Sequence, residues 1–242
     1  MPKDSSKDQA DKKSAECIKI AKDGPYLVSG NLPITKEIIV CDEDNNPLSW
    51  KKGEPCGNND CALCRCGQSK NKPFCDGSHI KIGFNGTETA NRKKHAEQAQ
   101  QIIGPELILS DAPDLCAGAG FCHRLGGTWD LTQNSDNPKS KETAIQQACD
   151  CPSGRLIALD KKTGKPIEPK FKKSLGLMED TSNKVSGPIM VRGGISLESS
   201  NGTKYEIRNR MTLCRCGQSK NKPFCDGSHI DCKFNDGDKS VN

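Results

Sequence analysis

The stretch Leu63–Ile80, which reads LCRCGQSKNKPFCDGSHI, is repeated without a single change as Leu213–Ile230. Each copy holds three cysteines and one histidine at the same offsets: Cys64, Cys66, Cys75 and His79 in the first, and Cys214, Cys216, Cys225 and His229 in the second. Thiolate and imidazole are ligands that suit zinc, copper and iron–sulfur clusters. The repeat therefore predicts two sites of one kind, each holding a metal or a cluster.

The spacing of these ligands bears on which metal group they hold. Cys-x-Cys brings two thiolates together on an extended loop, and one helical turn after Cys75 would place His79 on the same side. Asp76, Gly77 and Ser78 suit a helix start. Three cysteines and a histidine are also a normal structural zinc set, but zinc motifs usually pair Cys-x2–4-Cys with a second, similarly spaced pair. The spacing favours an iron–sulfur cluster and leaves zinc as the alternative.

The repeated stretch resembles the signature of the CDGSH iron–sulfur proteins, also called the NEET family, C-x-C-x2-S-x3-P-x-C-D-G-S-H. Every position of that signature is present twice, including Ser69 and Pro73 in the first copy and Ser219 and Pro223 in the second. The resemblance implies that each set of three cysteines and one histidine holds a 2Fe–2S cluster. It also implies pairing, because proteins of this family with one motif are homodimers.

Composition and charge limit the classes of protein to consider. A chain of 242 residues that is 33% hydrophobic and 4% aromatic has few apolar residues for one large core. We therefore expect several small modules, each stabilised by bound metal. The net charge of +5 is spread over isolated pairs such as Lys12–Lys13 and Lys172–Lys173, so no nucleic-acid partner is expected. No stretch is long and apolar enough to suggest a membrane partner.

The cysteine content raises the question of redox compartment. Fifteen cysteines would form disulfides in a secreted protein. The first residues show no apolar run typical of a secretory signal, and they include Asp4, Asp8 and Asp11, unlike an acid-poor transit peptide. We therefore expect a reducing compartment, the cytoplasm, with thiolates on iron.

The repeat extends beyond the ligand loops. The pattern of residues 24–30 recurs at 187–193, and Phe84 and Phe234 follow the two histidines at equal offsets. We interpret this as a duplication whose two units pack about a pseudo-two-fold axis, so that one chain forms a monomer with an internal pseudo-dimer. The expected segments are a disordered tail at 1–16, a first CDGSH domain at 17–96, a middle domain at 97–180 and a second CDGSH domain at 181–242.

Local patterns predict a few elements. A strand is expected at Tyr26–Val28 after a Gly-Pro turn, and a bend at residues 45–47, Asn-Asn-Pro. Residues 91–101 are polar and predict a helix or a linker. Residues 140–149, SKETAIQQAC, predict a helix that delivers Cys149 to the middle site.

The middle segment has its own ligand candidates: Cys116 and Cys122 in DLCAGAGFCHR, and Cys149 and Cys151 in QACDCPSGRL. The bacterial ferredoxin run is C-x2-C-x2-C, with a remote cysteine before proline. Cys116 and Cys122 match its first and third positions, Ala119 stands at the second, and Cys151 precedes a proline. The segment resembles a divergent single-cluster ferredoxin domain. The expected fold class is therefore α+β, with small β-rich CDGSH units around a ferredoxin-like α+β insert, all stabilised by iron–sulfur clusters.

The cluster type in the middle segment depends on the fourth ligand. The three matched cysteines favour a 3Fe–4S cluster, and a 4Fe–4S cluster would need Cys149 or His123 as well. The alternatives are a zinc site that uses all four cysteines and a metal-free domain held by packing. The other cysteines are expected to be structural or incidental, with a local redox pair as the alternative for two of them; they are Cys17, Cys41, Cys56, Cys61 and Cys232.

These residues predict a carrier and not an enzyme. No nucleophile–base motif, glycine-rich phosphate loop or nicotinamide fingerprint is present, so an enzymatic role is expected only as the electron-transfer component of a larger redox system. We predict an electron-transfer protein that acts with a redox partner protein. One alternative is a pH- or redox-labile cluster donor or sensor that serves an apo-acceptor protein, and another is a zinc-stabilised interaction protein.

Overall fold

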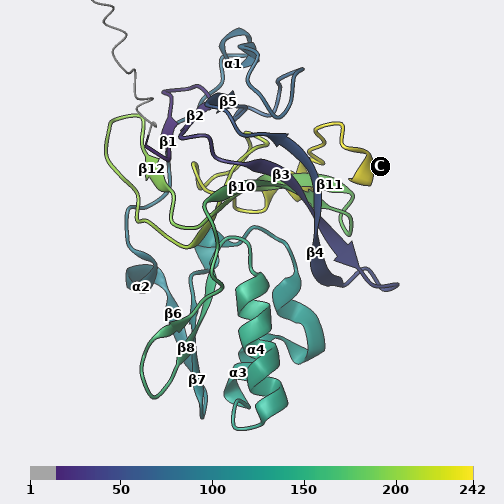
Figure 1. Ribbon diagram of the computed structural model, residues 1–242, viewed down its shortest axis with the longest axis vertical. Helices are drawn as coiled ribbons and strands as arrows, with labels where there is room; N and C mark the ends of the chain where they lie inside the picture. The colour runs from purple at the N-terminus through teal and green to yellow at the C-terminus, as the bar shows by residue number, and fades with distance from the viewer. Residues whose placement is uncertain (1–14, 242) are drawn as a thin grey trace, which may run out of the picture.

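The computed structural model describes residues 15–241, so the expected tail at 1–16 lies almost wholly outside the described residues. The fold is mixed α/β and mostly sheet, with three sheets and few helices (Figure 1). Within the described part, none of the helices has the length and apolarity that crossing a bilayer requires. Two β-rich units lie around a central domain, as the repeat predicts.

The first sheet belongs mainly to the first unit. Its four strands run in the order β12-β1-β2-β5. The strand expected at Tyr26–Val28 is confirmed as β2, and its neighbour β5 leads directly into the first ligand loop. The strands are β1 (Cys17–Ile20), β2 (Tyr26–Ser29), β5 (Cys61–Leu63) and β12 (Ser196–Glu198).

The second sheet combines strands of the second unit with strands of the first unit and of residues 97–180. Its five strands run in the order β13-β11-β10-β3-β4. The bend expected at residues 45–47 joins β3 to β4, and the Asp42 carboxylate accepts hydrogen bonds from the backbone there. The strands are β3 (Ile34–Cys41), β4 (Pro47–Gly57), β10 (Ser174–Asp180), β11 (Val185–Arg192) and β13 (Arg210–Leu213).

The second unit gives one strand, β12, to the first sheet, and the first unit gives two strands, β3 and β4, to the second sheet. β1 pairs in parallel with β12, and β3 pairs in parallel with β10. The exchange is reciprocal, because β2 and β5 correspond in the repeat to β11 and β13, and each pair adjoins its ligand loop. β10 lies within residues 97–180 but pairs with β3 and β11, so the end of that segment belongs to the sheet of the outer units.

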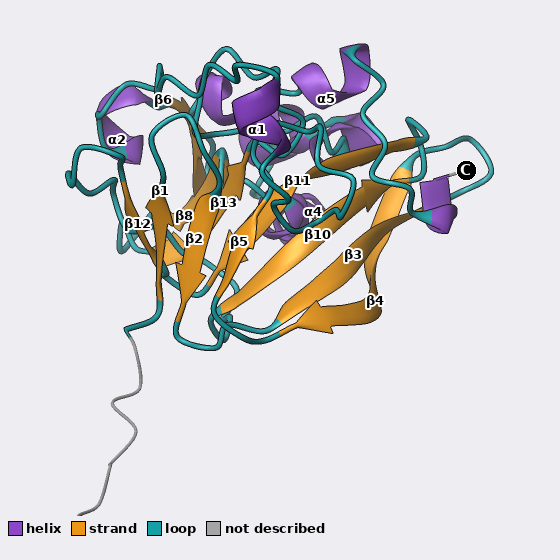
Figure 2. Cartoon of the chain, turned by 90° about the horizontal axis from the view of Figure 1, so that it is seen from above, coloured by secondary structure: helices purple, strands orange, loops and turns teal. Residues whose placement is uncertain are grey.

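One apolar core joins these two sheets, which lie side by side in Figure 2. It contains Ile18, Tyr26, Val28 and Leu63 from the first sheet and Leu175, Ile189, Met211 and Leu213 from the second. This differs from the expectation of separate small modules. Because the units exchange strands, the apolar faces of both sheets point toward the same interior. The few apolar residues of the chain are therefore gathered in one shared core.

The central domain has its own sheet, β6-β7-β8-β9, against which α3 and α4 pack. The helix expected at 140–149 is confirmed as α4, and the Asn137 side chain caps its start by accepting from Lys139 N and Ser140 N. Residues 91–101 form one short helix and then enter a strand. The elements are α2 (His95–Gln98), β6 (Gln100–Ile103), β7 (Leu107–Asp111), η1 (Pro113–Leu115), η2 (Phe121–Gly126), α3 (Thr128–Gln133), α4 (Pro138–Asp150), β8 (Leu156–Asp160) and β9 (Pro166–Ile167).

The remaining elements follow the two ligand loops. α1 (Ser78–Lys81) and α5 (Ser228–Asp231) are single turns that carry the two histidines, and η3 (Lys239–Val241) is near the C-terminus. In Figure 1, α1 lies at the opposite end of the molecule from α3 and α4. This places the first ligand loop far from the helices of the central domain.

Candidate metal centres

The first ligand loop starts where β5 ends. Cys64 and Cys66 follow the strand directly, with their Sγ atoms 3.7 Å apart. Cys75 lies just before α1 and His79 within it, with Sγ and Nδ1 3.3 Å apart. Cys64 N donates to Pro73 O at 2.8 Å, which ties the two halves of the loop together. The loop therefore presents its four ligands as two close pairs.

The second loop repeats this arrangement. Cys214 and Cys216 have their Sγ atoms 3.8 Å apart, and Cys225 Sγ lies 3.4 Å from His229 Nδ1. The serine of the motif has the same role in both copies, because Ser69 Oγ donates to Phe74 O and Ser219 Oγ donates to Phe224 O. These bonds fix the turn that precedes the third cysteine.

The spacing within each pair is that of two ligands on one tetrahedral ion. With bonds of about 2.3 Å to sulfur and about 2.0 Å to nitrogen, two sulfurs lie ~3.7 Å apart and a sulfur and a nitrogen ~3.5 Å apart. Both pairs in both loops are close to these values. Between residues 15 and 241, no group of three or more His, Cys, Asp or Glu side chains is arranged to hold a metal ion. Each loop thus offers two half-sites and not one fourfold site.

Burial disfavours the charged form of several of these thiols. It raises the pKa of Cys66 to about 11, and it raises the pKa of Cys225 as well. Such thiols become thiolates only when a cation compensates for the lost hydration. Metal or cluster binding would therefore release protons from these loops.

The central domain gathers three of its four candidate cysteines. Cys116, Cys122 and Cys151 line one small cavity, whose wall is completed by Arg155 and the glycine-rich run 117–120. Burial and the neighbouring Cys151 and Cys116 raise the pKa of Cys122 to about 11. The backbone here is compact, because Gly118 and Gly120 adopt φ values of 72° and 77° that few other residues tolerate.

The structure does not bring Cys149 or His123 to that cavity. Cys149 Sγ donates to Ile167 O at 3.6 Å and lines a neighbouring pocket with Trp50 and Arg210, and Cys151 borders both pockets. The His123 ring lies beside that of Trp129 and is tilted 40° to it, with ring centroids 5.5 Å apart. The helix that carries Cys149 is placed as expected, but its last turn directs the thiol away from Cys116 and Cys122.

Comparison with family models matches the chain in three places. The model described as iron-binding zinc finger CDGSH type matches residues 23–80 and 186–230, and the model described as divergent 4Fe-4S mono-cluster matches residues 102–161. The chain carries two CDGSH iron-binding units around a divergent 4Fe–4S domain. Curated proteins and solved structures gave no match.

The two CDGSH loops touch each other through their glycines. A Cβ atom at Gly67 would overlap the Cys216 carbonyl, and one at Gly217 would overlap the Cys66 carbonyl. Both glycines also have positive φ. Tyr26 of the first unit crosses to the second loop, where its hydroxyl donates to Cys214 O at 2.9 Å. The two sites are therefore in direct backbone contact.

Two buried arginines support the loops, and sequence reasoning missed them. Arg65 donates to Gly24 O at 2.8 Å and to Gly86 O at 2.9 Å. Its counterpart Arg215 donates to Gly187 O at 2.8 Å and forms ion pairs with Glu179 and Asp236. Each arginine thus fixes its loop to the glycine-proline pair of its own unit, which is a turn before β2 in the first unit and part of β11 in the second. The sequence signal that could have indicated them is the arginine that stands between the two cysteines of Cys-x-Cys in both copies.

The surroundings of the two CDGSH sites differ although their sequences do not. Cys225 and His229 are buried, with 3% and 1% of their surface exposed, whereas Cys75 and His79 are only partly buried. Burial lowers the pKa of His229 to about 4. Part of the cover comes from the 4Fe–4S domain, because Asn221 Nδ2 donates to Asp114 O at 2.7 Å and Gly118 contacts the Ile230 side chain. The helix α5, which carries His229, also packs against β11.

The remaining cysteines form no comparable set. All fifteen are free thiols. Burial raises the pKa of Cys56 and of Cys61, which disfavours the reactive thiolate, and both pack against the shared core. Cys17 contacts Ser29, and Cys41 contacts Thr181. These environments favour the structural interpretation of these cysteines.

Proposed function

We propose that this iron–sulfur protein is an electron carrier with one 2Fe–2S cluster in each CDGSH loop. The observation that carries the proposal is the arrangement of the ligands as two pairs per loop. A two-iron cluster takes two protein ligands on each iron, so Cys64 with Cys66 would hold one iron, and Cys75 with His79 the other. Cys214 with Cys216 and Cys225 with His229 would do the same. A single zinc ion would need all four donors around one point.

The divergent 4Fe–4S domain would hold a third cluster on Cys116, Cys122 and Cys151. Three cysteines around one cavity support a 3Fe–4S cluster, or a 4Fe–4S cluster whose fourth iron has no protein ligand. Cys149 and His123 have other partners, so we do not propose either as the fourth ligand. The nearby Arg155 pairs with Asp111, with Nε and Oδ1 2.6 Å apart, and would offset the negative charge of the thiolates.

The contiguity of the three sites supports electron transfer. The first and second loops meet at Gly67 and Gly217, and the second loop meets the 4Fe–4S domain at Gly118. When bound, the clusters would supply one-electron chemistry, and the neutral histidine in each CDGSH set would raise its potential relative to an all-cysteine set. We expect a redox partner protein in a reducing compartment such as the cytoplasm, and no chemical reaction catalysed by the chain alone.

One observation favours a second candidate function, cluster donation to an apo-acceptor protein. Cys75 and His79 are partly exposed, and the neighbouring Ile80 is 76% exposed. An acceptor could reach these ligands without opening the fold. The buried second set offers no such access.

The test is anaerobic purification followed by iron, sulfide and zinc quantitation and paramagnetic resonance of the reduced protein. We expect about 7 to 8 irons and about 8 sulfides per chain, because a 3Fe–4S and a 4Fe–4S cluster each contain four sulfides. His79→Cys should keep the first cluster and lower its midpoint potential, because a thiolate adds negative charge. A chain that contains zinc and no sulfide would contradict the proposal. Reversible reduction by a partner reductase would support the electron-carrier function. Transfer of iron and sulfide to an apo-acceptor protein would support the cluster-donor function.

A further inference from the structure

The two CDGSH loops have the same 18 residues, Leu63–Ile80 and Leu213–Ile230, so any difference between their outer faces reflects what covers them. On the second loop, one covering segment is the ligand loop of the 4Fe–4S domain, and residues 89–90 also contact the loop at Lys220 O and Lys222 O. Gly118 lies against Ile230, and a Cβ atom there would come within 2.7 Å of Ile230 Cδ1. Asn221 Nδ2 donates to Asp114 O at 2.7 Å. A small residue and a backbone carbonyl thus fit this face of the loop.

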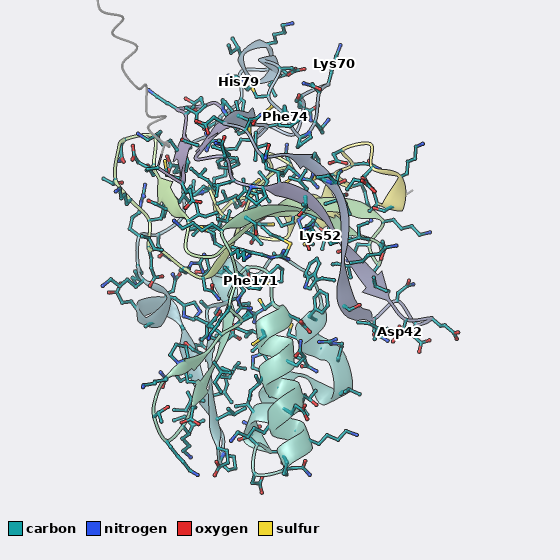
Figure 3. The ribbon with its side chains drawn as sticks, viewed as in Figure 1. Asp42, Lys52, Lys70, Phe74, His79 and Phe171 are labelled. Atoms are coloured by element: carbon teal, nitrogen blue, oxygen red, sulfur yellow. The ribbon has the colours of Figure 1, made fainter. Side chains whose placement is uncertain are left out.

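Within residues 15–241, the same face of the first loop has no such cover. Ile80, the counterpart of Ile230, is 76% exposed, and Asn71, the counterpart of Asn221, is exposed. Figure 3 shows His79 and Lys70 at the end of the molecule opposite the helices of the 4Fe–4S domain. The chain therefore covers one copy of this face and presents the other to solvent.

The residues that follow the repeat make the exposed face more apolar and more basic. The first loop continues with Lys81 and Ile82, where the second has Asp231 and Cys232. Ile82 is 51% exposed, and Lys81 is exposed as well. The two exposed isoleucines stand two residues apart beside a partly exposed ligand set, and neighbouring apolar side chains rimmed by polar residues are typical of an interaction site.

Charge on the covering segment indicates the kind of partner. In the second copy, Asp114 and Lys220 line one small pocket at the edge of the contact. The first loop offers the equivalent Lys70 and, in addition, Lys81. A partner that carries a carboxylate beside a glycine-rich ligand loop would meet both charges, and such complementarity raises the rate and specificity of association.

We propose that residues 70–82 form the docking surface for a separate iron–sulfur protein of the acidic ferredoxin class. Its glycine-rich ligand loop would lie on Ile80 as Gly118 lies on Ile230, and a nearby carboxylate would face Lys70 and Lys81. The contact would also shield His79 from water, as His229 is shielded within the chain. This inference rests on the proposed electron-transfer function, because it identifies the partner of the first site.

The experiment uses the full holoprotein and a bacterial single-cluster 4Fe–4S ferredoxin with an acidic surface as the probe. Binding is measured by titration calorimetry at low and high salt for the wild type and three variants. We expect saturable binding that weakens with salt, and a loss of about tenfold or more in affinity for Ile80→Glu. Lys81→Glu should weaken binding and reduce its salt dependence. Ile103→Glu, at a residue 63% exposed in β6, is the matched control and should bind like the wild type.

Two results would overturn the proposal. One is the absence of saturable binding, and the other is equal binding by Ile80→Glu and Ile103→Glu. Light scattering of the holoprotein alone adds a third arm, because self-association that Ile80→Glu abolishes would show a second copy of this chain as the occupant. Cluster content is measured first by paramagnetic resonance. Missing clusters would refute the proposed function, whereas intact, reducible clusters without ferredoxin binding would refute only the docking surface.

Discussion

Cys225 and Cys75 occupy the same position in identical loops, yet 3% of Cys225 is exposed and Cys75 is only partly buried. The difference extends to His229 and His79. Because the local chain is the same, the cause is what packs around the second loop: the 4Fe–4S domain lies on it, and α5 contacts β11. Access to a ligand behind such a cover needs local opening of the fold, which has its own free-energy cost.

We predict that a chelator removes iron from the two CDGSH sites at different rates. The partly exposed first site should release iron faster, by on the order of tenfold, because no opening has to precede attack on its ligands. Stopped-flow detection of the iron–chelator complex measures both phases. Cys75→Ser should remove the fast phase, and Cys232→Ser, at an exposed cysteine outside both sets, should change neither.

A second variant tests the cause of this difference. Gly118 has φ 72°, and a Cβ atom there would press on Ile230. Gly118→Val should therefore lift the cover and speed the slow phase toward the fast one. Two outcomes would show that the cover does not protect the second site. One is a single rate of iron release from both sites in the wild type, and the other is a slow phase that Gly118→Val does not change.

We also predict unequal effects of the two cysteines that flank Asp150. Cys151 shares a cavity with Cys116 and Cys122, whereas Cys149 donates to Ile167 O. Cys151→Ser should abolish the third cluster, and Cys149→Ser should keep it. Iron quantitation and paramagnetic resonance of the two variants provide the comparison. Loss of the third cluster in Cys149→Ser alone would show that the domain rearranges when it binds iron.

Between elements, the segment that follows α1 joins the first unit to the second. Glu88 is its main anchor, because it accepts hydrogen bonds from Tyr205 Oη at 2.7 Å, Ser199 Oγ at 2.9 Å and Ser200 N at 2.9 Å. Burial opposes the charge, but these hydrogen bonds outweigh it and lower the pKa of Glu88. The carboxylate thus links β12 to a segment more than a hundred residues earlier.

We predict that Glu88→Gln lowers the free energy of unfolding by about 1–3 kcal/mol at pH 7, because hydrogen bonds to a charged acceptor are lost. A lowered pKa stabilises the fold above the unfolded value of about 4.3, and this stabilisation is lost as the pH falls through the folded value. The difference between wild type and variant should therefore shrink in that window. Urea unfolding followed by circular dichroism measures it, with the exposed Glu43→Gln as control. If the difference in free energy of unfolding does not change with pH, the charge of the Glu88 carboxylate does not stabilise the fold.

Considered as a whole, the molecule already contains the pairing that a two-fold dimer would provide. β1 with β12 and β3 with β10 close the exchange within one chain, and both sheets share one core. We therefore predict a monomer. Light scattering of the holoprotein should give the chain mass of 26.2 kDa. A stable particle of twice that mass would contradict the internal pseudo-dimer.

Much of the candidate chemistry could be predicted from single stretches of chain. Metal ligation needs particular side chains at fixed offsets, so the two CDGSH sets and the pairing of Cys75 with His79 follow from residues close in sequence. The helix α4 and the strand β2 were also predicted, because periodicity and turn residues are local signals. The same signals did not give the direction of Cys149, which depends on how the end of α4 meets β9.

Long-range contacts decided the rest. The exchange of strands, the shared core, the carboxylates around Arg215 and the cover over His229 all join residues far apart in the chain, and no local pattern records which partner each will find. Two identical sequences therefore became two unlike sites. Their candidate ligands can be read from the sequence alone, but burial depends on neighbouring residues, and those neighbours are set only when the chain folds.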